Sequence, residues 1–281
     1  MVLPVIVRRH WFDARDLIRF PEAKATNVLR GGFGHSLRAI ATPDLYERVF
    51  QPKSLGSGPS GLGDPPRPFL FRASHLDGLE VAKHDDFYFD VHIFGDPDIA
   101  APISAALEHL FENGAGVGRG RAKLTAVADE RVELRLLDEE VATLAKVTFN
   151  TPTELKHEGR VMAQPDFAVL LRRIRDRVST LMSLYGPGEP ALDFQLFGQL
   201  ATEVRTVRSD IDLRDVARTS GRTGQTHPIG GMVGEVEYAG PLDAFIPFLR
   251  AAFYTGVGRH TVWGNGCIST EILLPPGPAA A

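Results

Sequence analysis

The sequence predicts an α+β fold of two tandem ferredoxin-like domains, each with the order β-α-β-β-α-β. An internal repeat is the first observation: Gly-Val-Gly-Arg occurs at 116–119 and again at 256–259, half a chain later. The second observation is the context of the repeat, because each copy follows a helical segment and precedes a strand-like run. A duplication accounts for both. We therefore expect one domain at residues 1–142 and the other at residues 143–281.

In the N-terminal half, residues 3–9 are strand-like and lead to a helix near 24–41. Aromatic and β-branched residues at 87–94 predict a further strand, and the turn that follows opens a helix to about residue 113. Residues 52–68 are rich in Gly, Pro and Ser, which is typical of an exposed loop.

The C-terminal half repeats this order. Residues 144–150 are strand-like, and a helix is expected near 165–185. The alternation at 234–238 predicts a strand, and Gly240-Pro241 opens a helix to about residue 254. With two middle strands in each half, both halves give the same plan.

Composition limits the class of protein. An apolar content of 43% with 23% charged residues is typical of a globular protein. We expect a cytoplasmic protein without a membrane span, because no apolar run reaches about 18 residues and the N-terminal charges follow the apolar residues, unlike a secretory signal. Cys267 is the only cysteine, which excludes an internal disulfide and a thiolate-rich zinc site.

The net charge of −4 argues against coating nucleic acid by bulk electrostatics, although it leaves room for a local basic groove. No histidine pair has the His-Glu-x-x-His spacing, so we expect neither a metal site nor a cofactor.

A glycine-rich turn at 255–268 connects a helix to a strand. Its glycines are Gly256, Gly258, Gly264 and Gly266. Successive amides in such a turn can line a concave anion site, but a helix cap with a tight turn and a bulge has the same composition. The loop alone does not decide between these interpretations.

Longer segments around this turn resemble a known family. The runs 231–238, 256–259 and 263–266 resemble the C-terminal domain of the CRISPR-associated repeat-processing endoribonucleases of the RAMP superfamily, the sixth Cas protein family. The segments at 29–38, 45–50 and 65–69 are similar to the opening of the same family. The likeness spans both halves, with its most specific part at 230–268.

The resemblance implies a metal-independent cut in CRISPR repeat RNA, in which the 2′-oxygen attacks the adjacent phosphate and leaves a cyclic phosphate and a 5′-hydroxyl. It also implies the repeat RNA as partner and an association with other Cas subunits, and it leaves a homodimer open. In this family a catalytic histidine commonly lies on or just after the first helix.

His35 lies in that region, between small neighbours, and is the candidate catalytic histidine; its alternative is a structural role. Tyr46 and Lys53 follow where the family often supplies a phenol and a cation, although Tyr46 also suits a core aromatic. His10, at the end of the first strand, is the reserve candidate.

RNA-binding candidates lie in the C-terminal half. Arg172 and Arg173 belong to an amphipathic helix whose arginines form the predicted outer face, and a merely solvated face is the alternative. Arg218 and Arg222 lie in a Gly/Thr/Arg loop suited to clamping a hairpin backbone. The remaining candidates belong to the glycine-rich turn: Gly256, Gly258, Arg259, His260, Gly264 and Gly266.

Two other functions stay open at this point. One is a RAMP subunit that binds CRISPR RNA as a scaffold without cutting it. The other is a small-molecule enzyme, since ferredoxin-like folds host many chemistries. A deep apolar pocket with converging acids would favour the enzyme.

Overall fold

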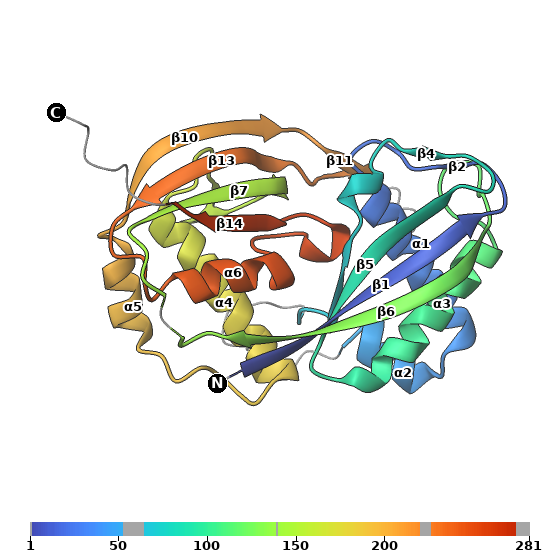
Figure 1. The fold of residues 1–281 in the computed structure, drawn as a ribbon, viewed down its shortest axis with the longest axis horizontal. Coiled ribbons are helices and arrows are strands. Elements are labelled where there is room, and N and C mark those ends of the chain that lie inside the picture. Colours follow the sequence, from blue (N-terminus) through green and yellow to red (C-terminus); the bar gives the residue numbers. More distant parts are fainter. Residues whose placement is uncertain (1, 53–64, 139, 220–225, 274–281) are drawn as a thin grey trace.

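Two four-stranded antiparallel sheets form the framework of the chain (Figure 1). The computed structural model describes residues 2–52, 65–138, 140–219 and 226–273. The first sheet has the order β3-β5-β1-β6, from β1 (Val2–Ala14), β3 (Phe69–Arg72), β5 (Asp86–Phe94) and β6 (Ala122–Arg135). The second has the order β10-β13-β7-β14, from β7 (Leu144–Thr153), β10 (Arg205–Arg214), β13 (Gly231–Ala239) and β14 (Ile268–Ile272).

Each sheet therefore places its own strands in the order second, third, first, fourth. Helices α1 (Ala25–Ile40) and α3 (Ala100–Glu112) pack together on one face of the first sheet, with α2 (Pro43–Phe50) beside α1. Helices α4 (Phe167–Tyr185) and α6 (Ile246–Thr255) do the same for the second sheet, with α5 (Phe194–Ala201) beside α4. This arrangement confirms the tandem ferredoxin-like fold.

The remaining strands and turns are short. Three two-residue or three-residue strand pairs are β2 (Ile18–Arg19) with β4 (Glu80–Val81), β8 (Lys156–His157) with β9 (Arg160–Val161), and β11 (Ala217–Thr219) with β12 (Thr226–Pro228). The 3-10 turns are η1 (Ser74–Leu76), η2 (Pro97–Ile99) and η3 (Thr261–Trp263). The predicted exposed loop at 52–68 falls largely outside the described residues.

The two glycines of the repeated tetrapeptide have similar φ angles in both halves. Gly116 and Gly118 have φ of 73° and 86°, and Gly256 and Gly258 have φ of 71° and 76°. These values lie in the left-handed region that glycine adopts at little cost. Each turn follows the last helix of its half, α3 or α6, so the repeat marks the same structural position twice.

The two halves share apolar packing. One buried cluster lies within the first half, but the cluster of the second half extends into the first. Leu3, Val5, Leu70, Phe94 and Leu134 come from strands of the first sheet and pack into this second cluster. Burial of apolar surface therefore holds the two sheets against each other.

Polar groups complete the contact at the C-terminal end of α6. Arg72 of β3 donates from Nη2 to the Phe253 carbonyl at 2.5 Å, and His92 of β5 donates from Nδ1 to the Tyr254 carbonyl at 2.9 Å. From the second half, Arg177 donates from Nε to the carbonyl of Thr255, the last residue of α6, at 3.2 Å. The final carbonyls of a helix lack partners within the helix and carry partial negative charge, so cationic donors stabilise them.

His10 differs from its prediction. It lies within β1, with 0% of its surface exposed, rather than at a strand end facing a cleft. Its Nε2 is 2.8 Å from Ser104 Oγ, and its ring stacks on Phe89. Strand β1 continues to Ala14, so the alternation of the sheet turns this side chain toward the helices.

Because two histidines are buried, we expect the free energy of unfolding to fall as the pH falls. Burial, with help from the Arg72 charge, lowers the pKa of His92 to about 3, and burial, with help from Arg8, lowers the pKa of His10 to about 4. The unfolded chain takes up these protons near pH 6.5, whereas the folded chain does not. The free energy of unfolding is therefore highest above pH 6.5, and each histidine lowers it by up to about 1.4 kcal/mol per pH unit as the pH falls.

Urea unfolding of the wild type, His92→Gln and His10→Gln between pH 7.5 and pH 5 checks this expectation. Each variant should lose stability less steeply with acidification than the wild type. His84→Asn is the matched control, because His84 is exposed and in a left-handed turn that asparagine tolerates. Equal slopes for the wild type and both variants would contradict the expectation.

Candidate nucleic-acid interface

Helix α1 carries the predicted catalytic histidine on its exposed side. Leu29, Phe33 and Leu37 recur at four-residue spacing and are fully buried, which turns the opposite side of the helix outward. His35 is exposed on that side. Arg38 lies three residues further on, so the two side chains are neighbours on the helix surface.

Tyr46 lies close to the same surface. Helix α2 begins at Pro43, and the Thr42 hydroxyl caps it by accepting from the Leu45 amide at 3.4 Å. The Tyr46 ring is half-buried and stacks on Phe50 at 5.5 Å. The guanidinium of Arg38 lies 5.5 Å from the Tyr46 ring centroid. The structure therefore brings His35 and Tyr46 to one surface, whereas Lys53 lies outside the described residues.

Further cations surround Phe50, behind this surface. The guanidiniums of Arg30 and Arg67 lie 4.5 Å and 5.6 Å from the Phe50 ring centroid. Arg67 also donates from Nε to the Phe50 carbonyl at 2.8 Å. Sequence reasoning missed Arg30, Arg38 and Arg67. The three-residue step from His35 to Arg38 is the signal that could have found one of them.

Packing within the chain accounts for three glycines of the C-terminal turn. A Cβ on Gly258 would lie 2.4 Å from the Glu154 carbonyl oxygen, and one on Gly266 would lie 1.9 Å from the Val257 carbonyl oxygen. A Cβ on Gly264 would lie 2.6 Å from Cβ of Thr26, in the first turn of α1. The turn therefore docks directly on the helix that carries His35.

Glu154 organises the charged residues of this turn. Its side chain is 9% exposed and accepts from Arg259 Nη1 at 2.7 Å. His260 Nε2 lies 3.8 Å from the other carboxylate oxygen, and Lys156 Nζ lies 3.9 Å from the first. The Arg259 amide also donates to the Glu154 carbonyl at 3.2 Å. The carboxylate thus fixes a basic turn whose Arg259 is half-exposed.

His260 is held as part of a flat aromatic pair. Its backbone is left-handed, with φ of 64°, and its ring stacks on Trp263 at 4.7 Å with an angle of 9° between the planes. Sequence reasoning singled out His260 but missed both Trp263 as its stacking partner and Glu154 as its anchor. Neither contact follows from spacing alone, since Glu154 lies about a hundred residues away in the chain.

The arginines of α4 do not all face outward. Arg172 is exposed, but Arg173 donates from Nε and Nη2 to the Lys156 carbonyl at 3.1 Å and 2.6 Å. The expectation of an outer arginine face is wrong for Arg177, since its side chain is buried against the end of α6; burial lowers its pKa to about 10. Arg218 lies in β11, and Arg222 lies outside the described residues.

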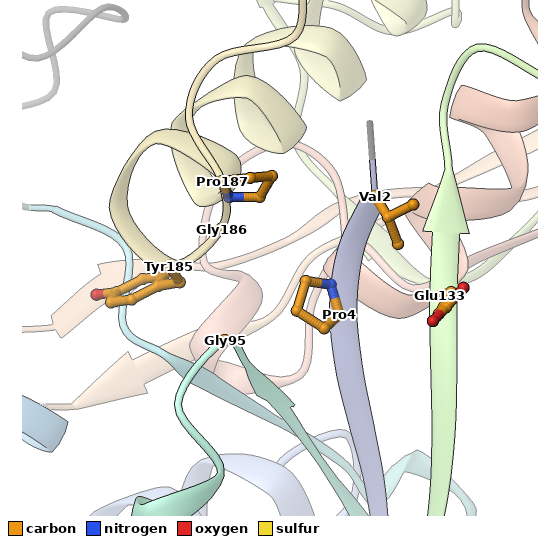
Figure 2. Close-up of a pocket in the computed structure, with 7 residues that line it drawn as sticks. All are labelled: Val2, Pro4, Gly95, Glu133, Tyr185, Gly186 and Pro187. Carbon is orange, nitrogen blue, oxygen red and sulfur yellow. The ribbon is translucent and has the colours of Figure 1, made fainter.

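The cavity drawn in Figure 2 lies at the junction of the two halves. It measures about 810 Å³ and is lined by Val2, Pro4, Gly95, Glu133, Tyr185, Gly186 and Pro187. Glu133 is its single carboxylate, so the cavity lacks the converging acids of a small-molecule active site.

The described residues contain no cluster of three or more His, Cys, Asp or Glu side chains that could hold a metal ion. None of the helices in the described ranges is long and apolar enough to cross a membrane.

Removing the charge of Glu154 should loosen the turn. We expect Glu154→Gln to lower the free energy of unfolding by about 1 kcal/mol, because a nearly buried carboxylate loses its bond to a half-exposed arginine. A double-mutant cycle with Arg259→Ala, measured by urea unfolding, isolates this pair. Glu158→Gln is the control, since Glu158 is 85% exposed. A coupling energy of zero between Glu154 and Arg259 would refute the role of Glu154.

Two family models match the chain. A family model described as CRISPR-associated endoribonuclease Cas6 matches residues 147–268. A second model, described as an N-terminal domain, matches residues 3–149. No curated protein matches the chain.

Solved structures match along nearly the whole chain. A Cas6 product complex is 16% identical with a TM-score of 0.64, covering 96% of this chain and 99% of that one. Cas6 of Thermus thermophilus is 14% identical with a TM-score of 0.60 over 96% and 99%. A partial Cas6-RT-Cas1–Cas2 complex is 14% identical with a TM-score of 0.64 over 97% of this chain and 46% of that one.

The structural matches establish the tandem ferredoxin-like fold. The two family models together cover the chain from the first strand, β1, to the start of the last strand, β14. The repeated glycine turn and the segment that follows it lie inside the Cas6 match. Residues 147–268 of this chain match the Cas6 family of CRISPR-associated endoribonucleases, and the chain as a whole has the fold of the solved Cas6 structures.

Proposed function

We propose that this protein cuts CRISPR repeat RNA into guide units without a metal ion. In this proposal residues 1–142 supply the reacting side chains, and residues 143–281 supply the glycine-rich turn that holds RNA. One observation carries it: an exposed histidine, His35, shares a helix surface with Arg38, whose guanidinium lies against Tyr46, while the turn from the other half docks on the same helix.

The reaction is a transesterification within the RNA. The 2′-oxygen attacks the adjacent phosphorus, a bond from phosphorus to O2′ forms, and the bond to O5′ breaks. The proton of the 2′-hydroxyl passes to a base, and a proton is delivered to the leaving O5′ by an acid. The products are a 2′,3′-cyclic phosphate and a 5′-hydroxyl.

His35 suits one of the two proton transfers, because histidine is the side chain that most often serves as a general acid or base. Tyr46 is our candidate for a second polar group, and Arg38 beside it suits the negative charge that develops on the phosphate. Lys53 stays a candidate cation.

The C-terminal half supports RNA binding through charge and stacking. Arg259 and His260 stand on the turn fixed by Glu154, and the paired rings of His260 and Trp263 can receive an unpaired base or a ribose. Exposed Arg172 and the strand residue Arg218 are further candidates for backbone contacts. Gly256, Gly258, Gly264 and Gly266 then shape the turn more than they contact RNA.

The similar structures support the partners as well. One is described as a Cas6 product complex, another as a Cas6 substrate mimic complex, and a third as a partial Cas6-RT-Cas1–Cas2 complex. We propose CRISPR repeat RNA as the substrate of this chain and other Cas proteins as partners. Association into a homodimer stays a prediction.

Cleavage of a labelled repeat RNA in EDTA tests the proposal. We expect a single cut that leaves a cyclic phosphate, and His35→Ala should slow single-turnover cleavage by about 10²-fold to 10⁴-fold, as expected for loss of a general acid or base. His35→Ala should keep most of its RNA affinity, because the turn and the arginines are untouched. His84→Asn, at an exposed histidine on another turn, should cut at the wild-type rate.

Each other outcome has a defined meaning. Tight binding without a cut would replace the proposal by the scaffold function, in which the same fold holds CRISPR RNA. A wild-type rate for His35→Ala would remove this histidine from the reaction. Absence of both binding and cutting would overturn the whole proposal.

A further inference from the structure

Helix α1 contains three glycines in its interior: Gly31, Gly32 and Gly34. Glycine is among the least favourable residues in a helix interior, because it loses the most backbone freedom on folding. Each of these glycines should therefore make possible a contact or a function that offsets its cost to helix stability. For two of them the structure shows such a contact.

Gly32 and Gly34 are required by packing inside the first half. A Cβ on Gly32 would lie 2.5 Å from Leu110 Cδ1, on α3. A Cβ on Gly34 would lie 2.3 Å from Phe50 Cζ, at the end of α2. Both distances are far below van der Waals contact, so these glycines let α3 and Phe50 approach α1 closely.

Gly31 has no such reason. A Cβ on Gly31 would meet no atom of the described residues within 4 Å. Its backbone is not among the positive-φ glycines, so its conformation suits any residue. It also lies well inside a helix that runs from Ala25 to Ile40, which excludes a capping role.

We propose that Gly31 is a positioning residue that keeps space open for the RNA backbone beside His35. This inference rests on the proposed function. Gly31 and His35 are one helical turn apart and therefore share a surface of α1. A ribose-phosphate chain presented to His35 must lie against that surface, where the missing side chain gives it room.

The position of Gly31 along the helix supports this role. Gly31 lies one turn before His35 on the exposed side of α1, opposite the buried Leu29, Phe33 and Leu37. A helical side chain points back toward the helix N-terminus. Any side chain at position 31 would therefore extend over the exposed surface that Gly31 shares with His35.

The surrounding charges favour a phosphate on this surface. Arg38 follows His35 on the same surface, and Arg30 directly precedes Gly31 with its guanidinium over Phe50. The acidic residues of α2, Asp44 and Glu47, are exposed and line a cavity with Leu184 and Tyr185 of α4. The open position thus has cations on both sides along the helix.

A size series at position 31 tests the inference, using Gly31→Ala and Gly31→Leu. The matched controls are Gly198→Ala and Gly198→Leu in α5, because a Cβ at Gly198 also meets nothing within 4 Å. All four variants should fold at least as well as the wild type, with a rise in Tm of about 2–4 °C for the alanine variants. The Tm series therefore separates a folding defect from a loss of function.

The functional readouts are RNA affinity and single-turnover cleavage in EDTA. We expect Gly31→Leu to cleave about 100-fold more slowly, as expected for a displacement of the reacting atoms by about 1 Å. Gly31→Ala should show a smaller loss, and both Gly198 variants should act as the wild type. A loss of cleavage that grows with the size of the side chain at position 31, together with a rise in Tm, is the result that a merely structural role of Gly31 cannot give.

The outcomes separate this inference from the proposed function. If the wild type cuts RNA and Gly31→Leu cuts equally fast with equal affinity, the inference is wrong and the proposed function stands. If the wild type binds RNA without cutting it, the proposed cleavage is wrong. A lower RNA affinity of Gly31→Leu would then still support the inference that Gly31 leaves room for the RNA backbone. If affinity is then also unchanged, or if the wild type binds no RNA, both are overturned.

Discussion

The C-terminal end of α6 is the point on which the arrangement of the molecule depends. Three donors meet its last carbonyls: Arg72 and His92 from the first sheet and Arg177 from α4. The chain leaves this helix through Gly256, whose amide donates to the Ala252 carbonyl at 2.8 Å, and enters the glycine-rich turn at once. Fixing the end of α6 therefore fixes the start of the turn relative to the first half.

This junction is unusual in its electrostatics. Burial lowers the pKa values of Arg72 and Arg177, and within the described ranges neither guanidinium forms an ion pair with a carboxylate. Two buried guanidiniums would be costly by themselves. The negative end of the helix dipole and the apolar cluster shared by the two halves offset that cost. The result is a stiff connection between the helix of His35 and the turn of His260, which suits a site assembled from both halves.

The fold could be predicted from the sequence because the duplication repeats local signals that each half needs for its own sheet. The helix of His35 was predicted from the sequence, and in the structure the burial of Leu29, Phe33 and Leu37 accounts for the exposure of His35. The contacts between distant segments could not be predicted in this way. Arg177 lies in an arginine-rich helix that resembles a solvated face, and only the approach of α6 buries it. His10 lies on a strand longer than its apolar run, and Glu154 reaches Arg259 only through the turn of the second half.

Glycines show most clearly where sequence and structure each contribute. In the sequence the glycines of α1 and of the C-terminal turn form two similar clusters, and both suggest close approach by another chain. In the structure Gly32, Gly34, Gly258, Gly264 and Gly266 each make room for this chain's own atoms. Gly31 makes room for no atom in the part of the chain that the structure describes. A residue that costs helix stability and serves no internal contact is the kind of local inconsistency expected at a functional surface, and it lies one turn from His35.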